Sequence, residues 1–237
     1  MNDAASLPDS EPFIRSVAEI SVRHALGKFT DTHSLTHIAA LAESISAAQY
    51  FVERMQGAAR FLDKRKYIDH ALAARRSEGL VLEFGVASGQ TVNHIAAAVD
   101  GPVYGFDVFT GLPEDWRPGY PAGSFARAGL PAVRGNVEMI VGLFQDTLPV
   151  FVDTHPGPVS LLHVDCDLYS ATKTVLRHLG HRLVEGSIIL FDEYLNYPGW
   201  RHHEFKAFQE YIAWSGQRYE YLSVVTVHQQ VAVRILD

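Results

Sequence analysis

The chain has 237 residues, of which 47% are hydrophobic and 20% are charged, and this is enough for one large globular domain with a buried core. Its formal net charge of −7 argues against a nucleic-acid partner, because binding to a duplex requires a basic face. The single cysteine excludes an intramolecular disulfide and fits a reducing cytoplasm, and no apolar stretch predicts a transmembrane helix.

The first part of the chain, residues 1–76, is predicted to be a separate helical segment. Residues 38–45 and 51–55 carry apolar side chains at spacings of three and four, which is typical of amphipathic helices, and residues 58–74 continue the pattern. No basic segment followed by an apolar one begins the chain, so no signal peptide is expected. The remainder, residues 77–237, is predicted to form one compact α/β domain.

Short apolar runs and helical patterns alternate after residue 79. This alternation predicts crossover connections and a mostly parallel sheet with helices on both faces. The last two predicted strands are so close in sequence that an antiparallel hairpin is expected. Because ligands of such sheets bind beyond the carboxyl ends of the strands, the residues after each strand are the candidates for chemistry. The predicted strands are 80–86, 102–107, 137–141, 159–164, 187–191, 219–227 and 230–236, and the predicted helices are 90–99, 171–183 and 203–214.

A glycine-containing turn, EFGVASGQT, follows the first predicted strand. Gly85 and Gly89 lack the third glycine of a dinucleotide fingerprint, so alone they fit either a tight turn or close approach of a ligand to the backbone. Ser88 and Gly89 begin a helix whose free N–H groups suit an anion. Asp107 ends the second strand, where an acid accepts hydrogen bonds from ribose hydroxyls or caps a turn. Together these residues favour a nucleoside-bearing cofactor without a pyrophosphate.

Acidic residues follow two of the predicted strands. Asp165 and Asp167 come after the fourth strand, and Asp192 and Glu193 come after the fifth. If these strands are neighbours, about 4.8 Å apart, the two acid pairs meet at one edge of the sheet. Clustered carboxylates repel one another and need a cation, a proton or a hydrogen-bonded cap, and oxygen ligands favour magnesium or calcium.

The residues around Asp165 have different expected roles. Asp165 is in phase with the strand and is expected to face the ligand edge. Asp167 precedes a predicted helix and is expected to cap it, with Ser170 as the alternative cap. Cys166 is expected to fill space as a small apolar residue. His163 is expected to be buried and paired, with a role in a ligand pocket as the alternative.

The long segment 110–136 is rich in glycine and proline and carries aromatic and basic side chains. Structureless loops of this length are uncommon in compact domains and are often lids. We expect a lid over an acceptor site, joined by the N-terminal helices. The alternative is a surface excursion that packs on the domain or on a subunit partner. Its aromatic residues and arginines are Trp116, Tyr120, Phe125, Arg117, Arg127 and Arg134.

The motifs VLEFGVASGQT, VYGFDVFTGLPEDW, HVDCDLYSAT and ILFDEY, in this order, resemble the class I S-adenosylmethionine-dependent methyltransferases. Among these, the chain is similar to the macrocin O-methyltransferase-like family (TylF/MycF/NovP type) over roughly residues 50–215. The resemblance implies a Rossmann-like, doubly wound, seven-stranded sheet with an antiparallel last strand. It also implies that Asp107 holds the ribose and that residues 142–145 lie against adenine. The implied cofactor-binding residues are Glu83, Gly85, Val86, Ser88, Gly89, Thr91, Asp107, Phe144, Gln145 and Asp165.

In metal-dependent relatives, the acid that matches Asp165 binds magnesium together with two acids after the fifth strand. Here those two are Asp192 and Glu193, where the usual pair is Asp-Asp. Asp165 is therefore predicted to bind Mg²⁺, to act as a catalytic base, or both. His202 is a second candidate base; the alternative for His202 and His203 is the solvated start of a helix.

The sequence thus predicts an O-methyltransferase that uses S-adenosylmethionine, with Mg²⁺ assistance, on a small-molecule hydroxyl such as that of a sugar or polyol in a natural product. No nucleic-acid or membrane partner is expected. We expect the protein to be a homo-oligomer in the cytoplasm. One alternative is an NAD-dependent oxidoreductase, which the glycine spacing disfavours. The other is a cofactor-binding scaffold protein without turnover, which would not need acids at two strand ends.

Overall fold

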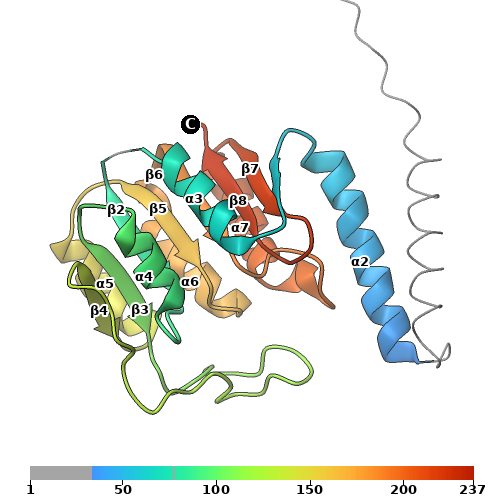
Figure 1. Cartoon of the computed structure of the whole chain (residues 1–237), viewed down its shortest axis with the longest axis horizontal. Helices are drawn as coiled ribbons and strands as arrows, with labels where there is room; N and C mark the ends of the chain where they lie inside the picture. Colours follow the sequence, from blue (N-terminus) through green and yellow to red (C-terminus); the bar gives the residue numbers. More distant parts are fainter. Residues whose placement is uncertain (1–33, 77) are drawn as a thin grey trace, which may run out of the picture. The chain divides into compact units, whose positions relative to one another are not determined.

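The computed structural model describes residues 34–76 and 78–237, which divide into two compact units. The smaller unit contains α2 (Leu35–Arg54; Figure 1). Residues 196–198 are grouped with this unit. The Ser34 side chain accepts a hydrogen bond from the backbone N–H of His37 and caps this helix. The helix expected in this part of the chain is therefore present. The part of the expected helical segment before residue 34 lies outside the described residues.

The larger unit begins at residue 57, well before the expected boundary at residue 76. The continuous helix expected over 58–74 is wrong, because a short strand, β1 (Ala59–Phe61), precedes the helix α3 (Lys64–Ala74). β1 pairs in parallel with a strand near the end of the chain, which joins this segment to the sheet. Asp63 caps α3 by accepting a hydrogen bond from the backbone N–H of Lys66 at 2.9 Å. A strand of three residues is too short to show an alternating pattern in the sequence.

The sheet has eight strands in the order β1-β7-β8-β6-β5-β2-β3-β4. Every neighbouring pair is parallel except those of β8, which is antiparallel to both β6 and β7, so the expected hairpin and reversed last strand are confirmed. The expected count of seven strands is wrong because β1 adds a strand at the edge beside β7. The remaining strands are β2 (Leu80–Phe84), β3 (Val103–Asp107), β4 (Val137–Val141), β5 (Val159–Val164), β6 (Leu183–Phe191), β7 (Tyr219–Val225) and β8 (Val231–Ile235).

Helices cover both faces of the sheet (Figure 1). α3 and α4 lie on one face, and α5, α6 and α7 lie on the other. The sequence did not predict α5, whose pattern is interrupted by Pro149. No described helix combines the length and hydropathy needed to cross a bilayer. The bounds are α4 (Gln90–Ala97), α5 (Phe144–Thr154), α6 (Tyr169–Leu179) and α7 (Glu204–Ser215), with 3₁₀ turns η1 (Gly180–Arg182) and η2 (Trp200–His202).

The chain runs outward from β2 to β3 and β4 and then returns to β5 on the other side of β2. The strand order therefore reverses between β2 and β5, which is where parallel sheets open a ligand crevice. All six residues of β5 are buried, as expected for a strand in the middle of a covered sheet.

The backbones that follow β2 and β5 come into direct contact at this point. Gly85 has φ +91°, and a Cβ atom at this position would lie 1.7 Å from the carbonyl oxygen of Asp165. The contact is held by two backbone hydrogen bonds of 2.9 Å, from the N–H of Gly85 to Phe106 and from the N–H of Asp165 to Phe84. Only glycine fits here, for both torsional and steric reasons.

We expect Gly85→Ala to lower the free energy of unfolding by about 3 kcal/mol or more, because the methyl group would overlap a backbone carbonyl that cannot move independently of β5. Urea unfolding followed by circular dichroism measures this change. Gly101→Ala is the matched control, since a Cβ atom there meets nothing within 4 Å. Similar stabilities for the two variants would contradict the packing described for Gly85.

Candidate functional site

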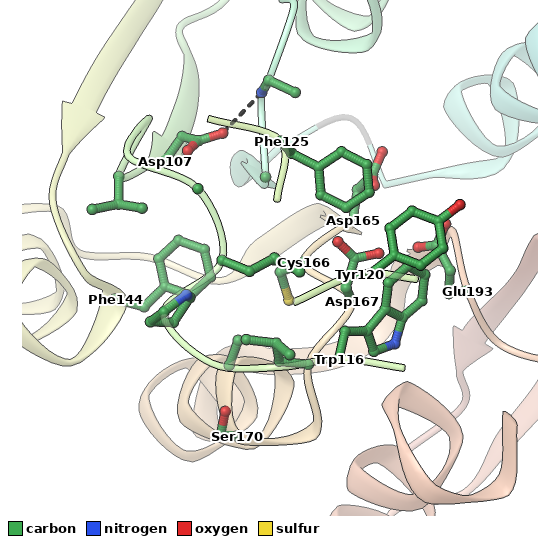
Figure 2. A pocket seen from close by; sticks show the side chains of 18 of the residues that line it. Asp107, Trp116, Tyr120, Phe125, Phe144, Asp165, Cys166, Asp167, Ser170 and Glu193 are labelled. Atoms are coloured by element: carbon green, nitrogen blue, oxygen red, sulfur yellow. Dashed lines mark hydrogen bonds between the residues drawn. The ribbon is translucent and has the colours of Figure 1, made fainter. Parts of the chain in front are cut away.

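A cavity of about 540 Å³ opens at the carboxyl ends of the central strands (Figure 2). Its wall includes the turn after β2, the end of β3, the start of α5, the residues after β5 and β6, and the loop after β3. The cavity lies at the position that the strand order predicts for a ligand.

Asp107 ties the glycine turn to the end of β3. One carboxylate oxygen accepts hydrogen bonds from the backbone N–H groups of Val86 and Ala87, at 2.9 and 2.8 Å, and the other accepts one from Phe109 at 2.7 Å. One of these bonds is drawn in Figure 2. In this structure Asp107 therefore caps the turn, which was one of its two expected roles. It also lines the cavity, and the oxygen that accepts from Phe109, Oδ1, retains a second lone pair for a ligand.

The predicted cofactor-binding residues fall into two groups. Those that line the cavity are Gly85, Asp107, Phe144, Gln145 and Asp165, whereas Glu83, Val86, Ser88, Gly89 and Thr91 do not line it. The second group lies deeper in the core or farther along the turn toward α4. Gly89, with φ +79°, is the residue that precedes α4, and a Cβ atom there would lie 3.0 Å from Pro131.

Two acidic segments meet after β5 and β6, which are neighbours in the sheet. Carboxylate oxygens of Asp165, Asp192 and Glu193 all lie within 4.8 Å of one another. The structure thus brings together the three residues predicted as metal ligands. Their oxygen-only donor set is the type that Mg²⁺ or Ca²⁺ prefers, so the residues present fit such an ion.

Lys64, the first residue of α3, reaches the same acids. Its Nζ contacts Oδ1 of Asp192 and lies 3.6 Å from Oδ2 of Asp165. Burial alone would lower the pKa of Lys64, but the two carboxylates outweigh burial and raise it. The sequence did not point to Lys64, because nothing in the local pattern shows that the start of α3 lies beside residues more than one hundred positions later.

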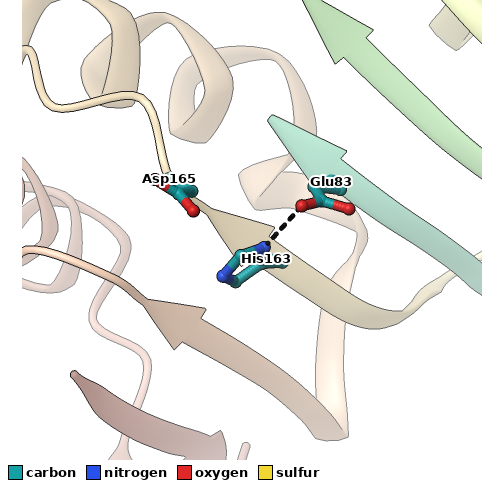
Figure 3. Close-up of side chains that lie close together, drawn as sticks. All are labelled: Glu83, His163 and Asp165. Carbon is teal, nitrogen blue, oxygen red and sulfur yellow. Dashed lines mark hydrogen bonds and ion pairs between the residues drawn. The ribbon is translucent and has the colours of Figure 1, made fainter. Parts of the chain in front are cut away.

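Behind the acids lies a buried pair, Glu83 and His163 (Figure 3). Nδ1 of His163 is 3.2 Å from Oε1 of Glu83, and Nε2 is 3.9 Å from Oδ1 of Asp192. Burial lowers the pKa of His163, but contacts with Asp192 and Glu83 outweigh burial and raise it to about 10. His163 is therefore the buried, paired histidine that was expected, and its protonated form is favoured at neutral pH.

The acids of this cluster differ in their affinity for protons. Burial, and then the charge of Asp192, raise the pKa of Asp165 to about 8 against the opposing effects of His163 and Lys64. Asp192 is different: burial alone would raise its pKa, but His163 and Lys64 hold it below the usual range. The cluster thus contains one carboxylate that stays ionised and one that holds a proton near neutral pH.

The prediction that Asp167 caps the following helix is wrong. α6 begins at Tyr169 without a side-chain cap, and Asp167 has φ +63°. Its buried carboxyl group is hydrogen-bonded to that of Glu193, so it belongs to the acid cluster. Burial, followed by the charge of Asp192, raises the pKa of Asp167 to about 7.

Ser170, the alternative cap, donates a hydrogen bond to Glu114 in the loop after β3 instead. Cys166 is buried as expected, and it also lines the cavity, with its Sγ 3.5 Å from the Thr172 hydroxyl. The residues after β5 thus contribute more to the cavity than the sequence indicated.

The two histidines before α7 lie in different surroundings. His202 is exposed and does not line the cavity, whereas the half-buried ring of His203 has its centroid 6.2 Å from that of Trp116. The next residue, Glu204, is fully buried and accepts a hydrogen bond from the backbone N–H of Glu193. Glu204 is a second residue to which the sequence did not point, because an acid in the first turn of a helix is ordinarily exposed.

Aromatic residues of the loop after β3 form one wall of the cavity (Figure 2). The guanidinium group of Arg117 lies 3.9 Å from the ring centroid of Trp116 and 5.0 Å from that of Tyr120. The rings of Tyr120 and Phe125 stack at 5.5 Å. The expected aromatic face therefore exists and contacts the cavity, and its function as a lid remains a prediction.

Residues 82–194 match a family model described as a methyltransferase domain. The fold resembles the calicheamicin methyltransferase CalS11, with a TM-score of 0.59 and 20% identity over 98% of this chain and 99% of that one. It also resembles the O-methyltransferase NovP, with a TM-score of 0.57 and 21% identity over 73% of this chain and 80% of that one. An apo structure of CalS11, which is described as a TDP-rhamnose 3'-O-methyltransferase, aligns with a TM-score of 0.51 and 21% identity. This alignment covers 98% of this chain and 99% of that one. No curated protein matches the sequence.

We expect Asp107→Ala to destabilise the glycine turn, because it leaves the N–H groups of Val86 and Ala87 without their acceptor. Hydrogen–deuterium exchange at these two amides should become about tenfold faster or more. Asp115→Ala is the control, since its carboxylate also accepts a backbone hydrogen bond but in the exposed part of the loop. Unchanged exchange at residues 86 and 87 in the Asp107 variant would show that the carboxylate does not hold the turn.

Proposed function

We propose that the protein transfers a methyl group from S-adenosylmethionine to a hydroxyl group of a small molecule, as the match of residues 82–194 to a methyltransferase-domain model and the fold similar to that of CalS11 suggest. The observation that carries this proposal is the cavity in which the glycine turn and Asp107 lie beside the carboxylates of Asp165 and Glu193. A methyl sulfonium is already activated, so the protein mainly has to align the methyl group with the acceptor oxygen.

In this proposal the cofactor occupies the side of the cavity formed by β2, β3 and the start of α5. The backbone at Gly85 admits the methionine part, and the remaining lone pair on Oδ1 of Asp107 accepts a hydrogen bond from the ribose. Phe144 and Gln145 lie against the adenine. This arrangement places the methyl group toward Asp165, whose backbone touches Gly85.

Asp165 is the proposed base for the acceptor hydroxyl. Its pKa of about 8 gives it a higher proton affinity than an ordinary carboxylate, which suits a base that works near neutral pH. Asp165, Asp192 and Glu193 would hold Mg²⁺ when it is bound, and the ion would lower the pKa of the hydroxyl. In either case Asp165 accepts or positions the proton that leaves the acceptor.

We propose a sugar or polyol part of a natural product as the acceptor. The aromatic wall formed by Trp116, Tyr120 and Phe125 offers flat apolar surface with polar groups at its edge, which suits a sugar ring. The similar fold of CalS11, a TDP-rhamnose 3'-O-methyltransferase, supports this choice. We further propose that the enzyme works in the reducing cytoplasm as a homo-oligomer.

We expect S-adenosylmethionine and S-adenosylhomocysteine, at concentrations about 100-fold above their Kd, to raise the Tm by several degrees, because a ligand stabilises the folded state by mass action. NAD should have no such effect. The same assay with and without Mg²⁺ reports whether the ion contributes to cofactor binding.

We expect Asp165→Ala to lower the rate of methyl transfer by a factor of about 10² to 10⁴, which is the usual contribution of a general base. The Tm shift with S-adenosylmethionine should stay nearly unchanged in this variant.

Asp153→Ala is the control for the Asp165 variant, because Asp153 is an exposed aspartate on α5 outside the cavity. A Tm that rises with NAD alone would overturn the proposed cofactor. Near-normal turnover of Asp165→Ala would overturn only the proposed base.

We expect the double substitution Tyr120→Ala and Phe125→Ala to raise the KM for the acceptor by about tenfold or more, since it removes two apolar contacts of the proposed lid. The Kd for S-adenosylmethionine, measured by calorimetry, should change by less than about twofold. Leu130→Ala is the control, because Leu130 is exposed in the same loop but does not line the cavity. Equal effects on both ligands would argue against a lid specific to the acceptor.

A further inference from the structure

The side chain of Lys64 enters the acid cluster from outside the motifs that form the rest of the site. Its Nζ contacts Oδ1 of Asp192 and lies 3.6 Å from Oδ2 of Asp165, so the ammonium group bridges the ends of β5 and β6. The side chain remains 35% exposed, and its flexible stem therefore has a path to solvent.

The ammonium group and a divalent ion cannot occupy this position together. A divalent ion binds carboxylate oxygens at about 2.0 to 2.6 Å, within the space that the Nζ of Lys64 takes beside Asp192. Two positive charges at this distance would also repel each other strongly. A metal that uses Asp165 and Asp192 therefore has to displace Lys64.

The cluster nevertheless retains acids that would favour a doubly charged ion. Asp167, Glu193 and Glu204 lie around the same point, and their electrostatic effects on one another and on Asp165 are mutually unfavourable. Oε1 of Glu204 is buried and has no hydrogen-bond partner among the described residues. Lys64 and His163 thus offset only part of the negative charge that these acids carry when they are ionised.

We propose that Lys64 is an internal cation that competes with a divalent metal ion for Asp165 and Asp192. It pairs with these carboxylates in the metal-free protein and swings into solvent when the metal binds. This inference rests on the metal-assisted form of the proposed function. It implies that Lys64 weakens metal binding and at the same time keeps the metal-free site folded.

The first test compares Lys64→Met with the wild type in a titration with Mn²⁺, without cofactor, by calorimetry and thermal shift. The variant should bind Mn²⁺ about tenfold more tightly or better, because the competing charge is gone. Without metal its Tm should be lower than that of the wild type, and saturating Mn²⁺ should restore it. Lys66→Met, which removes an exposed lysine from the same helix, should match the wild type in both measurements.

The second test uses the wild-type protein and does not depend on the folding of a variant. Lysine acetylation by an amine-reactive ester is quantified by mass spectrometry with and without Mn²⁺. Acetylation of Lys64 should rise several-fold at saturating Mn²⁺ as its amino group moves to solvent, whereas that of Lys66 should not change.

Two results would overturn the inference: Mn²⁺ binding by Lys64→Met that is no tighter than that of the wild type, or Lys64 acetylation that stays constant or falls at saturating Mn²⁺. Absence of Mn²⁺ binding by both proteins would overturn it as well. Methyl transfer and the Tm shift with S-adenosylmethionine are measured separately, so these results leave the proposed methyltransferase activity standing. If the wild-type protein showed neither methyl transfer nor a Tm shift with S-adenosylmethionine, the proposed function itself would be wrong.

Discussion

The contact between Gly85 and the carbonyl oxygen of Asp165 is the constraint on which the geometry of the site depends. The turn after β2 and the turn after β5 can pass this close only because position 85 has no side chain and tolerates a positive φ. The same contact places the backbone expected to admit the cofactor against the residue expected to carry the proton chemistry. Asp107 then fixes the other end of the turn by accepting three backbone hydrogen bonds.

The second feature that shapes the site is a concentration of acidic side chains with few cations. Asp192 is held ionised between Lys64 and His163, and Glu83 supports the histidine from the neighbouring strand β2. Burying charge is costly unless it is paired, so these partners allow the Asp192 carboxylate to remain ionised although it is buried. For Asp165 and Asp167, burial outweighs the effects of the nearby cations and raises the pKa. This difference separates a fixed anion from groups that can exchange protons or bind a cation.

The loop after β3 completes the cavity and is organised mainly by its own contacts. Arg117 lies over Trp116, and the loop closes on itself through backbone hydrogen bonds such as that from the N–H of Trp116 to Tyr120. Its attachment to the rest of the domain includes the bond from Ser170 to Glu114. Its contacts with the domain also include that between the rings of Trp116 and His203, so the loop is ordered both by itself and against the cavity.

Seven of the eight strands, the parallel sheet with its terminal hairpin, and the acids after β5 and β6 could be predicted from the sequence alone, because apolar runs and the residues that follow them are local patterns. The motifs also predicted the match of residues 82–194 to a methyltransferase-domain model. Only the tertiary structure showed that β1 joins the sheet, that Asp167 belongs to the acid cluster rather than to a helix cap, and that Lys64 and Glu204 reach the same cluster. These facts depend on contacts between residues far apart in sequence and on a backbone torsion at Asp167 that only the folded chain imposes.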